Sequence, residues 1–350
     1  MSQKIIFSNN VNQAIKNVLD EMEYNKLFVL TDVNTKYFVM PLFKEALGNA
    51  TEITIKAGDI NKNSESLIQV WKQLSDNGAT RQSVLINMGG GMVSDLGGFA
   101  ASTFKRGIRF INIPTTLLSA VDAAVGGKTG INFNGLKNEI GAFKEAEAVL
   151  ISTYPFDTLP LEEVKSGFAE MLKHGLLSNK TTFDKLLDYD FSQSHREHLL
   201  SLVEESVEVK KNIVNQDPFE KGLRRALNLG HTAGHAFESL AMKRLSPIPH
   251  GYAVAWGIIV ELVLSHMMLG FDSTTLHQYA QFVYNNYGAF HITCDDYNEL
   301  LDLMSHDKKS NSGEMNFSLL NGIGDIKIDC IASKDEVKSA LDIYRDLVHI

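Results

Sequence analysis

The chain has 350 residues, of which 44% are hydrophobic and 21% charged, as in an ordinary soluble globular protein long enough for two domains. Its formal net charge of −9 argues against a general nucleic-acid or anionic-membrane surface, so an anionic ligand would need a local group of cations. The two cysteines, Cys294 and Cys330, are too few for a disulfide framework or a thiolate metal site. Because residues 1–10 lack the pattern of a secretion signal, we expect a cytoplasmic protein.

Short aliphatic runs alternate with amphipathic stretches through the first half of the sequence. The runs end in polar or glycine residues, as buried parallel strands do. They span residues 26–32, 83–91, 109–116 and 148–153. Residues 64–78 show a helical pattern, with Ser64 as the expected N-cap and Gly78 as the stop. This alternation predicts an α/β domain with a doubly wound, mostly parallel sheet.

From Leu161 onward the strand signal nearly vanishes and helical patterns take over. We therefore expect a boundary near residue 159, with an α/β nucleotide-binding domain over residues 1–159. A mainly helical metal- and substrate-binding domain would then span residues 160–350. Residues 315–329 are an exception, because they could form a hairpin.

One apolar stretch, residues 253–269, is long enough to raise the question of a membrane span. It contains Glu261 and His266 and falls short of a clean bilayer span, so it indicates a buried core helix.

A glycine turn follows the second predicted strand. Residues 84–88 lead into Gly89-Gly90-Gly91, and residues 92–104 then follow a helical pattern. Such glycines let a backbone approach a pyrophosphate, and the helix N-terminus supplies N–H donors. The spacing is not G-x-G-x-x-G, and a plain turn would also explain three glycines, but the place at the end of a strand favours a nucleotide site.

The segment "AVGGKTGIN", residues 124–132, resembles the end of a phosphate loop. The full P-loop pattern needs a glycine five residues before the Gly-Lys-Thr triplet, and Asp122 stands there. A carboxylate at that point excludes the nucleotide-hydrolase interpretation. An anion-binding role for Lys128 remains.

Histidines suggest a metal site in the second half. His231 and His235 are four residues apart, on one face of a predicted helix, and His250 opens the apolar helix. From spacing alone the ligands would be His231, His235 and either Glu238 or His250, and two polar-face histidines are the alternative. Two histidines with a glutamate such as Glu170 and an open position would suit catalytic zinc.

Glu170 lies in a second predicted helix, residues 162–175. At about 100° per residue Glu163, Glu170 and Lys173 share one face of this helix. A solvated helix face is the alternative explanation.

Several cations stand beside glycine or asparagine or in apolar contexts, although a surface role would explain any one of them. They are Arg106, Lys128, Lys137, Lys210, Arg224 and Lys308.

Together these segments resemble the 3-dehydroquinate synthase family of sugar phosphate cyclases. The resemblance rests on five ordered stretches. They are "GGGMVSDLGGFAASTFKRG", "IPTTLLSAVDAAVGGKTGINFNGLKNEIGAF", "TLPLEEVKSGFAEMLKHG", "RRALNLGHTAGHAFE" and "HGYAV". It implies an α/β nucleotide-binding domain, an all-helical C-terminal domain, an active site between them and a homodimer.

The resemblance also implies an activity. Such enzymes use NAD and a divalent metal, normally Zn²⁺ with Co²⁺ possible, to convert 3-deoxy-D-arabino-heptulosonate 7-phosphate to 3-dehydroquinate and phosphate. The steps are transient oxidation, phosphate elimination, re-reduction and aldol closure, within the shikimate pathway of aromatic amino acid biosynthesis. The alternatives are another NAD- and zinc-dependent cyclase, a metal-dependent polyol dehydrogenase and an inactive NAD-binding protein.

By motif position, the resemblance implies Glu170, His231 and His250 as metal ligands, and it makes His235 a substrate or proton-relay residue instead. The residues implied in catalysis are Asp122, Lys128, Asn138, Glu170, Lys173 and His235.

The remaining positions are implied to hold the substrate and the cofactor. The substrate phosphate would be bound by Lys128, Asn138 and Lys308, with Arg106 supplied by the other subunit. The substrate carboxylate would be bound by Lys210 and Arg224. The substrate hydroxyls and the metal region would be contacted by Asp122, Lys173 and Asn228. The NAD site would comprise Asp32, Asn34, Asp59, Lys62, Gly91, Met92, Val93, Asp95, Thr115, Thr116, Lys137, Thr158 and Glu163.

Overall fold

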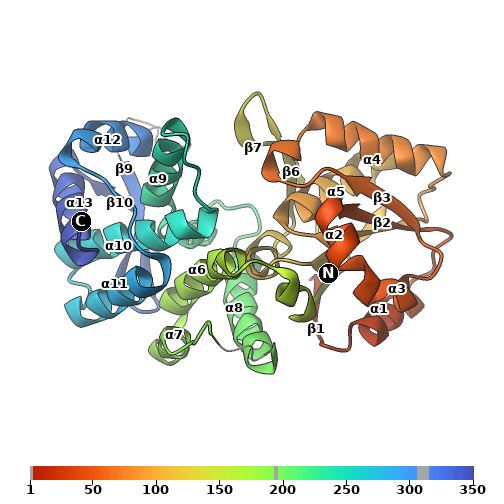
Figure 1. Cartoon of the computed structure of the whole chain (residues 1–350), viewed down its shortest axis with the longest axis horizontal. Helices are drawn as coiled ribbons and strands as arrows, with labels where there is room; N and C mark the ends of the chain where they lie inside the picture. The colour runs from red at the N-terminus through yellow and green to blue at the C-terminus, as the bar shows by residue number, and fades with distance from the viewer. Residues whose placement is uncertain (1–2, 193–195, 306–314) are drawn as a thin grey trace. The chain divides into compact units, whose positions relative to one another are not determined.

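The computed structural model describes residues 3–192, 196–305 and 315–350 (Figure 1). The chain divides into two compact units. Unit 1 comprises Met1–Pro160 and Ser194–Lys211, and unit 2 comprises Leu161–Gln193 and Asn212–Ile350. The return of Ser194–Lys211 to unit 1 was not anticipated from the sequence.

Unit 1 is built on a parallel sheet with the strand order β1-β8-β5-β4-β2-β3 in the described part of the chain. Its strands are β1 (Lys4–Phe7), β2 (Leu27–Asp32), β3 (Thr51–Ile55), β4 (Val84–Gly89), β5 (Arg109–Pro114) and β8 (Ala148–Ile151). The strands expected from the aliphatic runs are confirmed, and so is the parallel, doubly wound sheet. The short strands β1 and β3 were not predicted.

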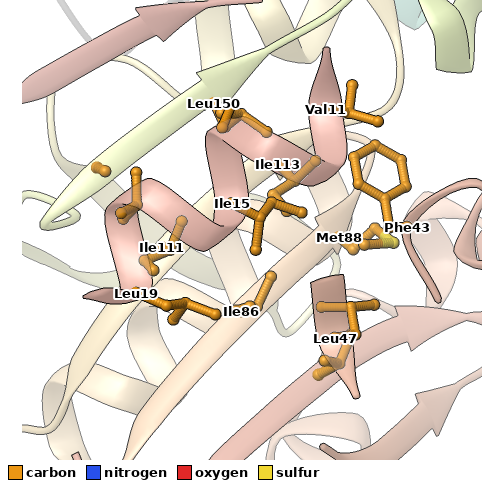
Figure 2. Close-up of a cluster of buried hydrophobic side chains, with 14 of the residues drawn as sticks. Val11, Ile15, Leu19, Phe43, Leu47, Ile86, Met88, Ile111, Ile113 and Leu150 are labelled. Carbon is orange, nitrogen blue, oxygen red and sulfur yellow. The ribbon is translucent and has the colours of Figure 1, made fainter. Parts of the chain in front are cut away.

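Helices cover both faces of this sheet. On one face α1 (Val11–Asp20) and α3 (Met40–Leu47) close a core with strand residues such as Ile86 and Ile111, as Figure 2 shows. Alternate strand residues face the other side. There α5 (Gly91–Thr103) packs so closely that a Cβ on Gly97 would lie 2.1 Å from the Asn87 side chain.

Helix α4 (Ser64–Asp76) begins one residue earlier than expected. Its N-cap is Asn63, whose Oδ1 accepts a hydrogen bond from the Ser66 N–H at 3.0 Å. The prediction of Ser64 as N-cap was therefore wrong, because the side-chain acceptor that satisfies the first turn comes from the asparagine.

The segment that carries Lys128 forms an antiparallel hairpin, which the sequence analysis missed. Strands β6 (Lys128–Phe133) and β7 (Leu136–Phe143) are joined by Asn134 and Gly135, with φ values of 51° and 79°. Positive φ at both central residues defines the type I′ turn that an Asn-Gly pair favours.

The other elements of unit 1 are short, except for one long helix. They are α2 (Val33–Phe38), 3₁₀ turns at Asp59–Asn61, Phe104–Arg106 and Tyr154–Thr158, and a π-helical turn at Ser119–Ala123. Helix α8 (Arg196–Gln216) groups with unit 1 as far as Lys211.

Unit 2 is mainly helical, as expected. Its elements are α6 (Leu161–Ser178), α7 (Lys180–Leu187), α9 (His231–Lys243), α10 (His250–Leu269), α11 (Ser273–Tyr287), α12 (Tyr297–Ser305), α13 (Lys334–Leu347), and 3₁₀ turns at Leu223–Asn228 and Cys294–Asp296. Strands β9 (Met315–Gly322) and β10 (Asp325–Ala332) pair antiparallel, so the hairpin expected at residues 315–329 is confirmed. This hairpin departs from the all-helical domain that the resemblance implied.

Helix α10 is long and apolar enough to cross a membrane by length and composition, but it is mostly buried inside the protein. Its buried residues run almost without interruption from Gly251 to Ser265. This burial fits the core helix expected from the sequence.

We expect the core beneath α1 to be sensitive to cavity formation. Ile86→Ala removes a side chain with 0% exposure and should lower the free energy of unfolding by about 2–5 kcal/mol. The matched change Ile68→Ala, at a side chain on α4 with 58% exposure, should alter it by less than about 0.5 kcal/mol. Urea unfolding of both variants measures the difference, and equal losses would contradict this account of the core.

Candidate metal centre and ligand-binding residues

Three side chains from three helices of unit 2 converge. Glu170 lies in α6, whereas His231 and His250 are the first residues of α9 and α10. Glu170 Oε1 lies 3.5 Å from His231 Nε2 and 3.8 Å from His250 Nε2. The structure thus brings together the three residues that the family resemblance implied as ligands.

The other ring nitrogen of each histidine has a fixed partner. His231 Nδ1 lies 3.1 Å from the carbonyl oxygen of Leu229, and His250 Nδ1 lies 3.1 Å from Glu238 Oε2. Both partners are acceptors, so each Nδ1 carries the proton and donates it. Each Nε2 then presents a lone pair, which is the arrangement that outer partners give to metal-binding histidines.

Glu170 is fully buried, with 0% exposure, beside the equally buried Lys173. The Lys173 ammonium donates to Glu170 Oε2 one turn along the helix. Glu170 Oε1 has no hydrogen-bond partner among the residues that the structure describes. The solvated helix face considered from the sequence is therefore wrong for Glu170 and Lys173.

The surroundings of His231 favour its neutral form. Burial, and then the positive charge of Lys173, hold the pKa of the His231 imidazole well below its usual value. The neutral form, which is the form that coordinates a metal, is therefore favoured near pH 7.

The spacing of the three ligand atoms fits a metal ion. Zinc–ligand distances of about 2.0–2.2 Å at the tetrahedral angle place neighbouring ligand atoms roughly 3.3–3.6 Å apart. The observed 3.5 and 3.8 Å are close to that range. The buried, unpartnered oxygen of Glu170 in the described structure is the group that a cation would satisfy.

A second group, His235, Glu238 and His250, also has ligand atoms within 4.8 Å of one another. It contains His235, which is exposed, and it shares His250 with the first group. Glu238 already accepts from His250 Nδ1, so it acts as an outer partner rather than as a ligand in the geometry observed. The first group is therefore the better candidate.

In unit 1 the strand order places a topological switch point between β2 and β4. After β2 the chain forms β3 on one side of β2 and then crosses back to form β4 on its other side. Open α/β sheets bind ligands at such a switch point. Helix α5 begins there at Gly91, and no described side chain caps its first turn. Its N-terminus can therefore receive a phosphate, which agrees with the glycine-turn interpretation.

Two other features of this edge fit a bound nucleotide. Asp32, at the end of β2, caps α2 through the N–H groups of Asn34 and Thr35. The Thr115 hydroxyl, after β5, is buried with no hydrogen-bond partner in the described ranges, as a group awaiting a ligand would be.

Lys62 joins two predicted sites of unit 1. Its buried ammonium donates to Asp95 Oδ2 and to Asn138 Oδ1. Burial raises the pKa of Asp95, and the charge of Lys62 opposes that rise. A residue implied for NAD thereby contacts one implied for phosphate, and sequence spacing gave no sign of this contact.

The π-helical turn holds Asp122, whose carboxylate and carbonyl oxygens accept from the Lys210 ammonium. Lys210 is 5% exposed, so this ion pair keeps the lysine in place. Lys128 is exposed at the first position of β6.

Arg224 belongs to unit 2 and is 3% exposed. The backbone N–H of Arg224 donates to Asp217 Oδ2, which also accepts from the Gly222 N–H. The Arg224 guanidinium donates to the Pro218 carbonyl at 2.7 Å. These contacts fix the start of the 3₁₀ turn that carries Arg224. Asn228 is the last residue of the same turn.

Arg106 is exposed, and both it and Lys105 have positive φ, 69° and 51°. Lys308 lies outside the described residues. The other positions implied for NAD lie in unit 1, except Glu163 in the first turn of α6. They are Asn34, Asp59, Met92, Val93, Thr116, Lys137 and Thr158.

The two candidate ligand groups make opposite predictions. His231→Ala removes a proposed metal ligand and should weaken Zn²⁺ binding by at least about 100-fold. Loss of a residue that only hydrogen-bonds a ligand costs up to about that much. His235→Ala should leave Zn²⁺ binding nearly unchanged. Zn²⁺ titration of the metal-free chain against a competing chelator measures both affinities, and the reverse order would identify the second group as the site.

Comparison with known proteins identifies the family. The 3-dehydroquinate synthase N-terminal family matches residues 52–166, and the C-terminal family matches residues 167–310. The chain is 47% identical over 346 residues to 3-dehydroquinate synthase from Parabacteroides distasonis, covering 98% of each chain.

Solved structures show the same fold at lower identity. 2-Epi-5-epi-valiolone synthase from Streptomyces hygroscopicus, with NAD⁺ and Zn²⁺ bound, has a TM-score of 0.86 at 23% identity, covering 99% of this chain and 97% of that one. 2-Deoxy-scyllo-inosose synthase, complexed with carbaglucose-6-phosphate, NAD⁺ and Co²⁺, has a TM-score of 0.83 at 21% identity, covering 96% and 95%. With both family domains matched across the chain and near-complete coverage of a relative at 47% identity, this protein belongs to the 3-dehydroquinate synthase family.

Proposed function

We propose that this protein is a 3-dehydroquinate synthase, which converts 3-deoxy-D-arabino-heptulosonate 7-phosphate to 3-dehydroquinate and phosphate. The observation that carries the proposal is the convergence of Glu170, His231 and His250 in a chain 47% identical, over its full length, to a 3-dehydroquinate synthase. The family's role in aromatic amino acid biosynthesis, a cytoplasmic location and a homodimer are parts of the same proposal.

Two cofactors fit the residues present. Glu170, His231 and His250 would hold a divalent metal, Zn²⁺ or Co²⁺ as in the structural neighbours, which supplies Lewis-acid polarisation of a substrate hydroxyl. The residues at the switch point and the α5 N-terminus would hold NAD, which supplies a reversible hydride acceptor.

The chain's own residues would hold the two charged ends of the substrate. Lys128 and Asn138 would bind the phosphate. Because Asn138 Oδ1 accepts from Lys62, its amide N–H donors point away from that lysine and can face an anion. Arg224 and Lys210 would bind the carboxylate, a task for which the planar guanidinium of an arginine is well suited.

Residues near the metal ligands would orient Glu170 and transfer protons. Lys173 neutralises one oxygen of Glu170 and so leaves the other oxygen to the metal. His235, whose ring centroid lies 5.3 Å from that of His231, is exposed and can exchange a proton with a bound hydroxyl.

A different sugar phosphate cyclase is the principal alternative, and a metal-dependent polyol dehydrogenase is the second. The alternatives differ in substrate and in the fate of NAD. Turnover of sedoheptulose 7-phosphate without turnover of the heptulosonate would identify the first. Steady accumulation of NADH with glycerol would identify the second.

The direct test measures the release of phosphate from the heptulosonate with substoichiometric NAD, before and after a chelator removes the divalent metal. We expect many turnovers per NAD, loss of activity on chelation and recovery with Zn²⁺ or Co²⁺. A requirement for one NAD per product would contradict the proposal.

Lys128→Ala should lower turnover by roughly 100-fold, because a cation that faces developing phosphate charge is lost. NAD affinity, measured by isothermal titration calorimetry, should be unchanged. The control Lys72→Ala removes an exposed lysine of α4 and should keep full turnover. Equal losses of turnover and NAD affinity in Lys128→Ala would mean that Lys128 belongs to the nucleotide site.

Arg106→Ala tests the shared active site of the proposed homodimer. Neither this variant nor Glu170→Ala should be active alone, but mixed dimers should regain part of the activity, since one site then has both residues intact. Sedimentation first establishes the dimer, and activity is then followed across mixing ratios. Activity no higher than the sum of the separate variants would assign Arg106 to its own subunit's site.

A further inference from the structure

Glu261 is a fully buried carboxylate in the apolar helix α10, with 0% exposure. Neither the resemblance nor the predicted sites assign it a role. A buried carboxylate is costly unless hydrogen-bond donors surround it, so its partners indicate why it is there.

Those partners are backbone N–H groups at the start of α9. Glu261 Oε2 accepts from the Gly230 N–H at 2.6 Å. Oε1 accepts from the N–H groups of Thr232 at 3.1 Å and Ala233 at 3.3 Å. The donors therefore flank His231 on both sides.

Helix α9 lacks an acceptor of its own at this end. Its N-cap is Gly230, with φ of 81°, and none of the described side chains near it in sequence caps the helix. The first N–H groups of a helix need an acceptor, and an anion there is also favoured by the helix dipole. Glu261 supplies both from a neighbouring helix.

Glycines bring the two helices close enough for this contact. A Cβ on Gly257 would lie 2.1 Å from the Gly230 carbonyl oxygen, and a Cβ on Gly234 would lie 2.9 Å from the Ala253 carbonyl oxygen. A Cβ on Gly230 would lie 2.3 Å from Ile258, and the positive φ there also favours glycine. The backbones of α9 and α10 are therefore in direct contact.

We infer that Glu261 is a positioning residue for the metal centre. It fixes the first turn of α9 from the opposite helix and thereby holds His231 Nε2 toward Glu170 Oε1. The inference rests on the proposed metal-dependent function. His250 is the first residue of α10, the helix that carries Glu261. The Glu261 carboxylate therefore links the first turn of α9, which carries His231, to the helix that carries His250.

The test measures metal affinity rather than activity. The full chain is stripped of metal and titrated with Zn²⁺ against a competing chelator, and the Co²⁺ absorption bands report the coordination geometry. Glu261→Ala should weaken Zn²⁺ binding about 10- to 100-fold, as losing an outer partner does, and alter the Co²⁺ bands. Glu261→Gln keeps the size and one acceptor oxygen, so it should show a smaller loss.

Ser265→Ala is the matched control on the same helix. Ser265 is also fully buried, and its Oγ accepts from the Leu320 N–H of β9 at 3.0 Å. Its hydroxyl donates to the backbone carbonyl of Glu261 at 2.6 Å, so neither contact involves the Glu261 carboxylate or α9. This variant should lower the thermal unfolding temperature while leaving Zn²⁺ affinity and the Co²⁺ bands unchanged.

The outcomes separate this inference from the proposed function. If the unsubstituted chain binds no divalent metal, the proposed function fails. If it binds Zn²⁺ and the Glu261 variants bind equally well, the positioning role alone is overturned. Equal weakening by Ser265→Ala, or failure of Glu261→Gln to fold where Ser265→Ala folds, would make Glu261 a general stability residue and would also overturn it.

Discussion

The constraint on which the site depends is the burial of the Glu170 carboxylate. Lys173 neutralises one of its oxygens, and the other faces the Nε2 lone pairs of His231 and His250. Both imidazoles have committed their Nδ1 protons to Leu229 and Glu238, so neither offers a proton to the carboxylate. An anion and two lone pairs that converge in a buried place repel one another, and a cation between them removes that repulsion.

Two lysines of this acidic chain are buried in ion pairs. Lys62 and Lys210 are almost fully buried, and each is held by a carboxylate, from Asp95 and Asp122. Such pairing holds a buried ammonium in one orientation. Under the proposed function the substrate carboxylate would have to compete with Asp122 for Lys210, so part of its binding energy would be spent on exchanging one partner for another.

Much of the fold could be predicted from the sequence, because buried parallel strands form continuous aliphatic runs. The β6–β7 hairpin was not predicted although its Asn134-Gly135 pair is a strong turn signal, because the glycines and lysine at its start resemble a phosphate loop more than a strand. Spacing placed Glu170 and Lys173 on one face of a helix but could not show that this face is buried.

Contacts between elements lay beyond the sequence. Spacing alone paired His231 with His235, because it detects residues of one helix and not a carboxylate that arrives from α6. Glu261 was visible as one charge in an apolar run, which argued against a membrane span, but its partners lie about thirty residues earlier in the chain. The division into units has a related consequence: a protein cut after Pro160 would lose the part of α8 that brings Lys210 to Asp122. Gene fragments that encode the two halves would therefore divide an ion pair of unit 1 between separate polypeptides, and unit 1 could not be transplanted into another protein as one uninterrupted segment.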